Sequence, residues 1–182
     1  MAGPEILTGR LSLSCLLAAD ASAFFEYRSD PEVGRYQSFV PDSLDDVEKF
    51  IDGLQRVAFD TPGSWFQFGI RLGKTGILIG DLGVHFDADD SRQFEVGLTV
   101  APSHQGQGFA TEAATGILDH LLVALQKHRV FASVDPRNQP AIALLQRVGM
   151  RQEAHFRESL WFKGEWVDDM VFGMLASEWS VR

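Results

Sequence analysis

The chain has 182 residues, of which 45% are hydrophobic and 23% charged, and this balance is typical of a globular protein and excludes a disordered one. Its formal net charge of −9 argues against a nucleic-acid partner, because binding to a phosphate backbone needs clustered Lys and Arg side chains. Cys15 is the only cysteine, so no internal disulfide can form, and no apolar run approaches the length of a membrane span. We therefore expect a single cytoplasmic domain over residues 1–182, with no membrane or nucleic-acid partner.

The first half of the chain predicts one strand, two helices and three further strands. In chain order these are a strand over residues 6–16, helices over 20–27 and 43–59, and strands over 65–72, 77–86 and 93–100. Ser43 is placed to cap the second helix, and the two acidic residues that follow in its first turn suit the helix dipole. The Gly-Lys-Thr-Gly run at 73–76 predicts a hairpin turn.

The second half alternates helices and strands before it ends in a hairpin. Its elements are a helix over 108–127, a strand over 130–134, a helix over 138–148, and two hairpin strands over 150–162 and 166–175. Gly149 stops the second of these helices. The complete order is β-α-α-β-β-β-α-β-α-β-β.

A glycine-rich run from Gln105 to Ala110 lies where the strand over 93–100 gives way to the next helix. A glycine turn that opens a helix leaves several backbone N–H groups unpaired, and the helix dipole adds partial positive charge there. Such a turn can hold a phosphate, and glycine lets the backbone approach a pyrophosphate closely. The chain contains neither a Gly-x-x-x-x-Gly-Lys-Ser/Thr motif nor a complete dinucleotide fingerprint, which excludes the two best-known phosphate loops.

The order Gln-x-x-Gly-x-Ala at this junction, with Asn138 opening another helix one strand later, resembles the GCN5-related N-acetyltransferase (GNAT) superfamily. The Gln-Gly-Phe-Ala-Thr-Glu-Ala run and the hairpin from Phe162 to Asp168 are most similar to the branch that contains the ribosomal-protein alanine N-terminal acetyltransferases (RimJ/RimL-like). The resemblance implies one α/β domain with a mixed, mostly antiparallel sheet of about seven strands, splayed apart between the fourth and the fifth.

That resemblance also implies an acyl-CoA-dependent N-acyltransferase. Acetyl-CoA would be the cosubstrate, and the acceptor a primary amine of a small molecule or of a protein N-terminus, with direct transfer and no metal. The residues implied to hold the cofactor are Leu98, Thr99, Val100, Gln105, Gly106, Gln107, Gly108, Phe109, Ala110, Thr111 and Asn138. Two alternatives stay open: a non-catalytic acyl-CoA-binding or regulatory module with the same fold, and, less favoured, a nucleotide-binding protein of another kind.

Glu95 is the candidate general base. Strand alternation places it on the face opposite the apolar residues that pack on the helix, so its carboxylate could take a proton from the acceptor ammonium through a water. A solvent-facing strand carboxylate without a catalytic role is an equally weighted alternative. Asp81 and His85 share a face of the preceding strand and are reserve candidates.

The acceptor pocket is expected between the loop over 36–41 and the terminal hairpin. Its candidate lining residues are Tyr36, Arg157 and Trp166, whereas we expect Trp161 to be a core residue. Many superfamily members carry a tyrosine acid in the helix over 138–148, but here that stretch reads Ala-Leu-Leu-Gln-Arg, so no obvious general acid remains. Monomer and homodimer are both open.

Overall fold

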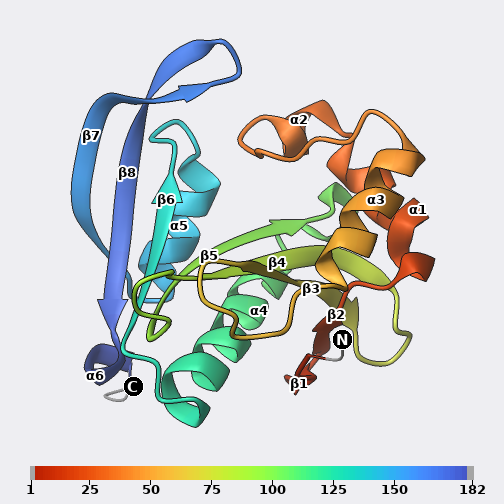
Figure 1. Ribbon diagram of the computed structural model, residues 1–182, viewed down its shortest axis with the longest axis horizontal. Helices are drawn as coiled ribbons and strands as arrows, with labels where there is room; N and C mark the ends of the chain where they lie inside the picture. The colour runs from red at the N-terminus through yellow and green to blue at the C-terminus, as the bar shows by residue number, and fades with distance from the viewer. Residues whose placement is uncertain (1–2, 180–182) are drawn as a thin grey trace.

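A computed structural model describes residues 3–179, which form one eight-stranded sheet with helices on both faces (Figure 1). The strands are β1 (Ile6–Leu7), β2 (Leu11–Cys15), β3 (Trp65–Leu72), β4 (Leu78–Phe86), β5 (Gln93–Val100), β6 (Arg129–Val134), β7 (Arg151–Phe162) and β8 (Glu165–Leu175). Their order in the sheet is β1-β2-β3-β4-β5-β6-β8-β7, and every neighbouring pair is antiparallel except β5 with β6. The predicted mixed, mostly antiparallel α/β fold is therefore confirmed.

The sheet has one strand more than predicted, because residues 6–16 form two short strands instead of one. The chain turns between them, where the Thr8 N–H donates to the Leu11 carbonyl at 2.9 Å, and β1 pairs back on β2. Glu112 stabilises this turn by accepting hydrogen bonds from Thr8 Oγ1 and from the Arg10 backbone N–H, each at 2.6 Å. The Thr-Gly-Arg run at residues 8–10 forms the turn, and it interrupts the apolar alternation between Leu7 and Leu11.

The helical segments differ from the predictions mainly at their ends. They are η1 (Ala18–Asp20), α1 (Ala21–Arg28), α2 (Pro31–Gly34), α3 (Leu44–Leu54), η2 (Pro102–His104), α4 (Phe109–Leu118), η3 (Asp119–Ala124), α5 (Gln139–Arg147) and α6 (Ala176–Trp179). The Ser43 hydroxyl caps α3 as predicted, but the helix ends at Leu54 and not near residue 59. α4 passes into a wider π-helical turn, η3. Within residues 3–179, no helix is both long and apolar enough to cross a membrane.

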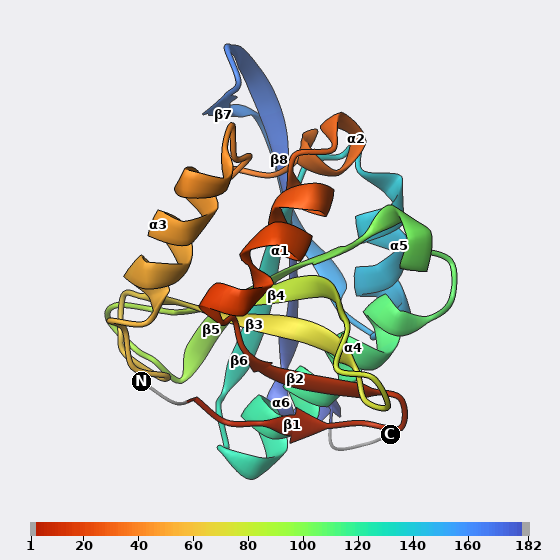
Figure 2. The same cartoon turned by 90° about the vertical axis from the view of Figure 1, so that its right-hand side faces the viewer.

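Two hydrophobic clusters cover the two faces of the sheet. α4, η3 and α5 pack on one face, where the fully buried side chains of Phe86 and Phe94 lie at the centre of the larger cluster. α1 and α3 pack on the other face around Phe24 and Ile51. Figure 2 shows these helices on the two sides of β2, β3 and β4. The central strands are therefore rigidly held from both sides.

β5 and β6 are paired only where both strands begin. Three residue pairs join them, from Gln93 with Arg129 to Glu95 with Phe131. Beyond these pairs β5 continues to Val100 along β4, and its other edge has no strand partner among the described residues. This is the splay predicted between the fourth and fifth strands, which are β5 and β6 in the eight-stranded sheet. It leaves an open main-chain edge that leads to the glycine-rich loop.

Candidate active site

The glycine-rich loop before α4 carries a run of unpaired backbone N–H groups. Within residues 3–179, the amides of residues 106–111 have no hydrogen-bond partner, and no side chain caps the helix at Gly108. Gly106 and Gly108 have backbone φ angles of +72° and +81°, which residues with a Cβ atom rarely adopt. A Cβ placed at Gly106 would meet no heavy atom within 4 Å, so the space in front of the loop is open. Consecutive unpaired amides at a helix N-terminus fit the phosphate groups of a nucleotide cofactor such as CoA.

The two glutamines of the loop use their side chains to hold its shape. Gln105 Nε2 donates to the Val100 carbonyl at 2.9 Å, and Gln107 Nε2 donates to the Ser103 carbonyl at 3.1 Å. These bonds tie the loop to the end of β5 and to η2. The backbone amides, more than these side chains, are therefore left for a phosphate.

Arg10 supports the loop from the N-terminal hairpin, a contact that sequence reasoning missed. Its Nε donates to Glu112 Oε2 at 2.6 Å, its Nη1 donates to the Gln107 carbonyl at 3.0 Å, and its guanidinium lies 4.4 Å from the centre of the Phe109 ring. Because a peptide bond is planar and trans, a Gln107 carbonyl turned toward Arg10 directs the Gly108 N–H the opposite way. Arg10 thus helps to orient an amide of the loop.

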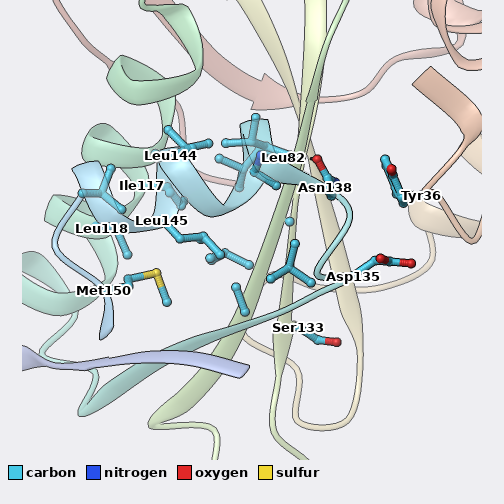
Figure 3. Close-up of a pocket in the computed structure, with 18 of the residues that line it drawn as sticks. Tyr36, Leu82, Ile117, Leu118, Ser133, Asp135, Asn138, Leu144, Leu145 and Met150 are labelled. Carbon is cyan, nitrogen blue, oxygen red and sulfur yellow. Dashed lines mark hydrogen bonds between the residues drawn. The ribbon is translucent and has the colours of Figure 1, made fainter. Parts of the chain in front are cut away.

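A pocket of about 190 Å³ lies between the splayed strands (Figure 3). Residues 96–98 of β5 form one wall and residues 132–134 of β6 the other, while α4 and α5 contribute apolar side chains that include Ile117 and Leu145. Figure 3 shows the apolar side chains gathered on one side and Asn138 on the other. The pocket is therefore apolar on one side and polar on the other.

Asn138 caps α5 and also lines this pocket. Its Oδ1 accepts a hydrogen bond from the Ala141 N–H at 3.3 Å. The cap occupies the amide oxygen, so the Nδ2 group, which has no partner among the described residues, is left to donate toward the pocket. The structural and the ligand-binding roles of this residue are thus compatible.

Glu95 lies on β5 at the point where the splay begins. Phe94, the residue before it, packs in the α4 cluster, so Glu95 points to the opposite face of the sheet, as strand alternation predicts. Burial raises the pKa of the Glu95 carboxyl, His85 and the Ser133 backbone N–H oppose this shift, and the charge of Asp169 adds to it. A raised carboxyl pKa suits a group that exchanges protons closer to neutral pH.

The structure does not support Asp81 as a reserve base. This carboxylate is fully buried, accepts hydrogen bonds from Tyr27 Oη at 2.8 Å and Arg28 Nε at 3.0 Å, and forms an ion pair with Arg28 Nη2. Tyr27 and Arg28 therefore occupy both oxygens of this carboxylate, and Asp81 does not line the pocket. His85 stays a reserve candidate, since it lies opposite Glu95 in the β4–β5 register.

Comparison with known proteins identifies the family to which most of the chain belongs. Residues 10–151 match the family model of the acetyltransferase (GNAT) domain. The chain belongs to the GNAT acetyltransferase family. The family is that of acyl-CoA-dependent N-acetyltransferases, so the enzyme class predicted from the sequence is confirmed at this level.

Three proteins illustrate the similarity. This acetyltransferase is 30% identical to an uncharacterized N-acetyltransferase, p20, from Bacillus licheniformis, over 96% of this chain and 98% of the relative. A GNAT-family acetyltransferase from Bacillus anthracis has a similar structure, with a TM-score of 0.86 at 25% identity over 96% of this chain and 100% of that one. RimJ from Mycobacterium smegmatis, solved in complex with CoA-disulfide, has a TM-score of 0.80 at 28% identity over 97% and 88% of the two chains.

On the acceptor side of the acetyltransferase, only Tyr36 of the predicted lining residues reaches the pocket. Arg157 and Trp166 are exposed on the β7–β8 hairpin, away from it. Trp166 is 58% exposed and lies 5.4 Å from the ring of Trp161, which is 59% exposed, so the prediction of Trp161 as a core residue is wrong. Figure 1 shows that the hairpin extends beyond the rest of the sheet, and both tryptophans belong to its two strands.

Gln37, Ser133 and Asp135 are polar pocket residues that sequence reasoning did not single out. Ser133 is the one polar residue of β6 after Arg129, which was a usable signal, and its Oγ donates to Asp169 Oδ1 at 2.6 Å. Gln37 lies inside the loop expected at the pocket, but no pattern distinguished it from its neighbours.

The tip of the β7–β8 hairpin contacts the end of α2, because Lys163 Nζ donates a hydrogen bond to the Gly34 carbonyl. This bond connects the two segments expected to enclose the acceptor. Over residues 3–179, no group of three or more His, Cys, Asp and Glu side chains is arranged to hold a metal ion.

Proposed function

We propose that this acetyltransferase passes an acyl group, most simply acetyl, from CoA directly to a primary amine of a small molecule or of a protein N-terminus. The observation that carries the proposal is the run of unpaired amides at residues 106–111, next to the open edge of β5. A phosphate loop that leads into a splayed sheet accommodates a cofactor with a charged head and an extended arm. Acetyl-CoA supplies the acyl group in the activated form of a thioester.

Different parts of the chain bind different parts of the cofactor. The amides of residues 106–111 hold the pyrophosphate, and Arg10 and Glu112 keep the loop in shape behind them. The open edge of β5, which includes Leu98, Thr99 and Val100, pairs with the amides of the pantetheine arm, and Asn138 Nδ2 donates to the arm from the opposite side. These contacts place the thioester next to the acceptor amine. The reaction then takes place between two groups that are already held together, and not through a bimolecular encounter in solution.

Glu95 takes the proton from the acceptor ammonium through a water, which leaves the neutral amine to attack. The α5 side chains that line the pocket beyond Asn138 are Ala141, Leu144 and Leu145, none of which can donate a proton. The helix that follows Asn138 therefore supplies no general acid, as expected from the sequence, and water protonates the leaving thiolate unless the Tyr36 hydroxyl, which also lines the pocket, donates to it.

The direct test is a screen of small amines and N-terminal peptides with acetyl-CoA, read by release of the free thiol. Turnover on any of them supports the proposal. Tight binding of acetyl-CoA with no turnover on any amine would instead support the non-catalytic module. A homodimer and a cytoplasmic location stay predictions, and light scattering of the purified protein tests the first.

A further inference from the structure

Gln37 is held in one orientation by a chain of buried polar groups that begins on β4. Arg28 Nη1 donates to Gln37 Oε1 at 2.7 Å. Arg28 is fixed in turn by Asp81, which accepts from its Nε at 3.0 Å and pairs with its Nη2. Arg28 is 7% exposed and Asp81 is fully buried, so water does not compete for the bonds between these two residues.

The chemistry of the guanidinium decides which end of the Gln37 amide faces the pocket. A guanidinium has only hydrogen-bond donors, so it binds the oxygen of an amide and not its nitrogen. Gln37 therefore turns its NH2 group away from Arg28. Gln37 lines the pocket beside Tyr36, and its Nε2 has no partner among residues 3–179. Figure 3 shows Tyr36 standing apart from the apolar side chains, on the side of Asn138 and Asp135.

We propose that Gln37 is a specificity-determining residue whose NH2 group donates to a carbonyl oxygen next to the acceptor amine, and that Arg28 is its positioning residue. The acceptor class is then an α-amino acyl compound, such as a peptide N-terminus or an amino-acid amide. This inference rests on the proposed function, because it names the acceptor of that same site.

Polyamines and simple alkylamines fit the same arrangement poorly. A protonated amine offers only donors, so a second ammonium or an alkyl group would leave the Gln37 NH2 group unpaired when the pocket is closed by substrate. A site built to hydrogen-bond a substrate group discriminates strongly against analogues that lack it. An α-amino amide carries its carbonyl one carbon from the amine, where a side chain beside the reacting centre can reach it.

The experiment compares L-alaninamide with sec-butylamine. Both carry the amine on a carbon that also bears a methyl group, but sec-butylamine has no carbonyl group. The measured quantity is the ratio of kcat/KM for the two amines, with spermidine as a polyamine reference. In the parent protein we expect L-alaninamide to be the better acceptor of the three. In Gln37→Met, which keeps the length of the side chain but removes its donors, the ratio should fall about tenfold or more, mainly through a higher KM for L-alaninamide.

Two further variants separate this role from a structural one. Gln37→Glu retains an oxygen for Arg28 and loses the donors, so its ratio should fall as in Gln37→Met while its thermal stability stays near that of the parent. Arg28→Lys keeps the charge beside Asp81 but releases the Gln37 amide, so the ratio should fall in the same direction. A ratio measured on one preparation does not depend on the fraction of folded protein, so a less stable variant still gives an answer.

Equal losses on both amines in Gln37→Met and Gln37→Glu would overturn the inference, because Gln37 would then act on the cofactor or on the fold. A parent protein that prefers sec-butylamine or spermidine would overturn it as well. These results differ from a failure of the proposed function, in which acetyl-CoA would release no thiol with any amine.

Discussion

Arg10 and Glu112 lie 102 positions apart in the sequence and form an ion pair of 2.6 Å that joins the turn between β1 and β2 to the first turn of α4. The pair lies directly behind the glycine-rich loop, because Arg10 also donates to the Gln107 carbonyl. The N-terminal hairpin therefore helps to shape the loop to which we assign the cofactor phosphates, as well as extending the sheet.

Removing the charge of Glu112 should lower stability at neutral pH but not in acid. Burial alone would raise the pKa of Glu112, but the hydrogen bonds from Thr8 and Arg10 outweigh it and hold this pKa below its ordinary 4.5. A carboxyl with a lowered pKa stabilises the fold above its unfolded pKa and loses that contribution as the pH falls through the folded one. Glu112→Gln should melt about 2–4 °C below the parent at pH 7, and the difference should shrink as the pH falls through the lowered folded pKa.

The matched control for this experiment is Glu48→Gln, the same change at an exposed position of α3. It should not alter the melting temperature at either pH. A pH-independent loss in Glu112→Gln would show that its side chain acts through packing and not through its charge.

Gly106→Ala should weaken binding of acetyl-CoA by at least about tenfold. The new methyl group would stand in the open space in front of the loop, where the pyrophosphate is expected. Gly76→Ala is a close control, since Gly76 has a φ of +71° against +72° for Gly106, and a Cβ at either position meets nothing within 4 Å. Both variants carry the same backbone strain, so a thermal shift with acetyl-CoA that is retained in Gly76→Ala and lost in Gly106→Ala isolates the ligand contact. Equal shifts in the two variants would contradict the phosphate-loop assignment.

Glu95→Gln should reduce kcat by roughly 10²- to 10⁴-fold with little effect on the affinity for acetyl-CoA. The base must be deprotonated to act, so the parent rate should rise with pH through a pKa that burial has moved above the ordinary 4.5 of a glutamate. The residual rate of Glu95→Gln should not show this rise with pH. If Glu95→Gln keeps full turnover and His85→Gln does not, the base is on β4.

Asp81→Asn should lower the free energy of unfolding by about 3–5 kcal/mol, because it leaves the buried Arg28 guanidinium without its counter-charge. Asp52→Asn breaks an exposed pair with Arg56 and should have almost no effect. Urea unfolding of both variants measures the difference. A mild effect at Asp81 would mean that water reaches Arg28 in solution.

Much of the fold could be predicted because local signals and tertiary packing agree. The glycine turn before α4, the caps at Ser43 and Asn138, and the direction of Glu95 away from the α4 cluster all follow from turn chemistry or from strand alternation. The turn after Leu7 was not predicted; it has local hydrogen bonds between Thr8 and Leu11, but the contacts that hold it against α4 go to Glu112, a residue far along the chain.

The acceptor side was predicted less well, for two physical reasons. Trp161 and Trp166 have the composition of core residues, but whether a strand is covered depends on how far it projects from its neighbours. Asp81 was placed on the correct face of β4, but the buried partner that removes it from catalysis, Arg28, comes from a distant helix. The face of the strand on which a side chain lies could be predicted from the sequence, whereas its partner from a distant part of the chain could not.

The short pairing of β5 with β6 has a consequence for the lifetime of the protein. Only three residue pairs hold the two parts of the sheet together across this seam, and a cosubstrate lying along the open edge would supply the missing strand. Any ligand that binds the folded state alone shifts the folding equilibrium by mass action. We expect hydrogen exchange of the amides at 96–100 to slow on addition of acetyl-CoA, and proteolysis of the protein to accelerate when a cell's acetyl-CoA supply falls.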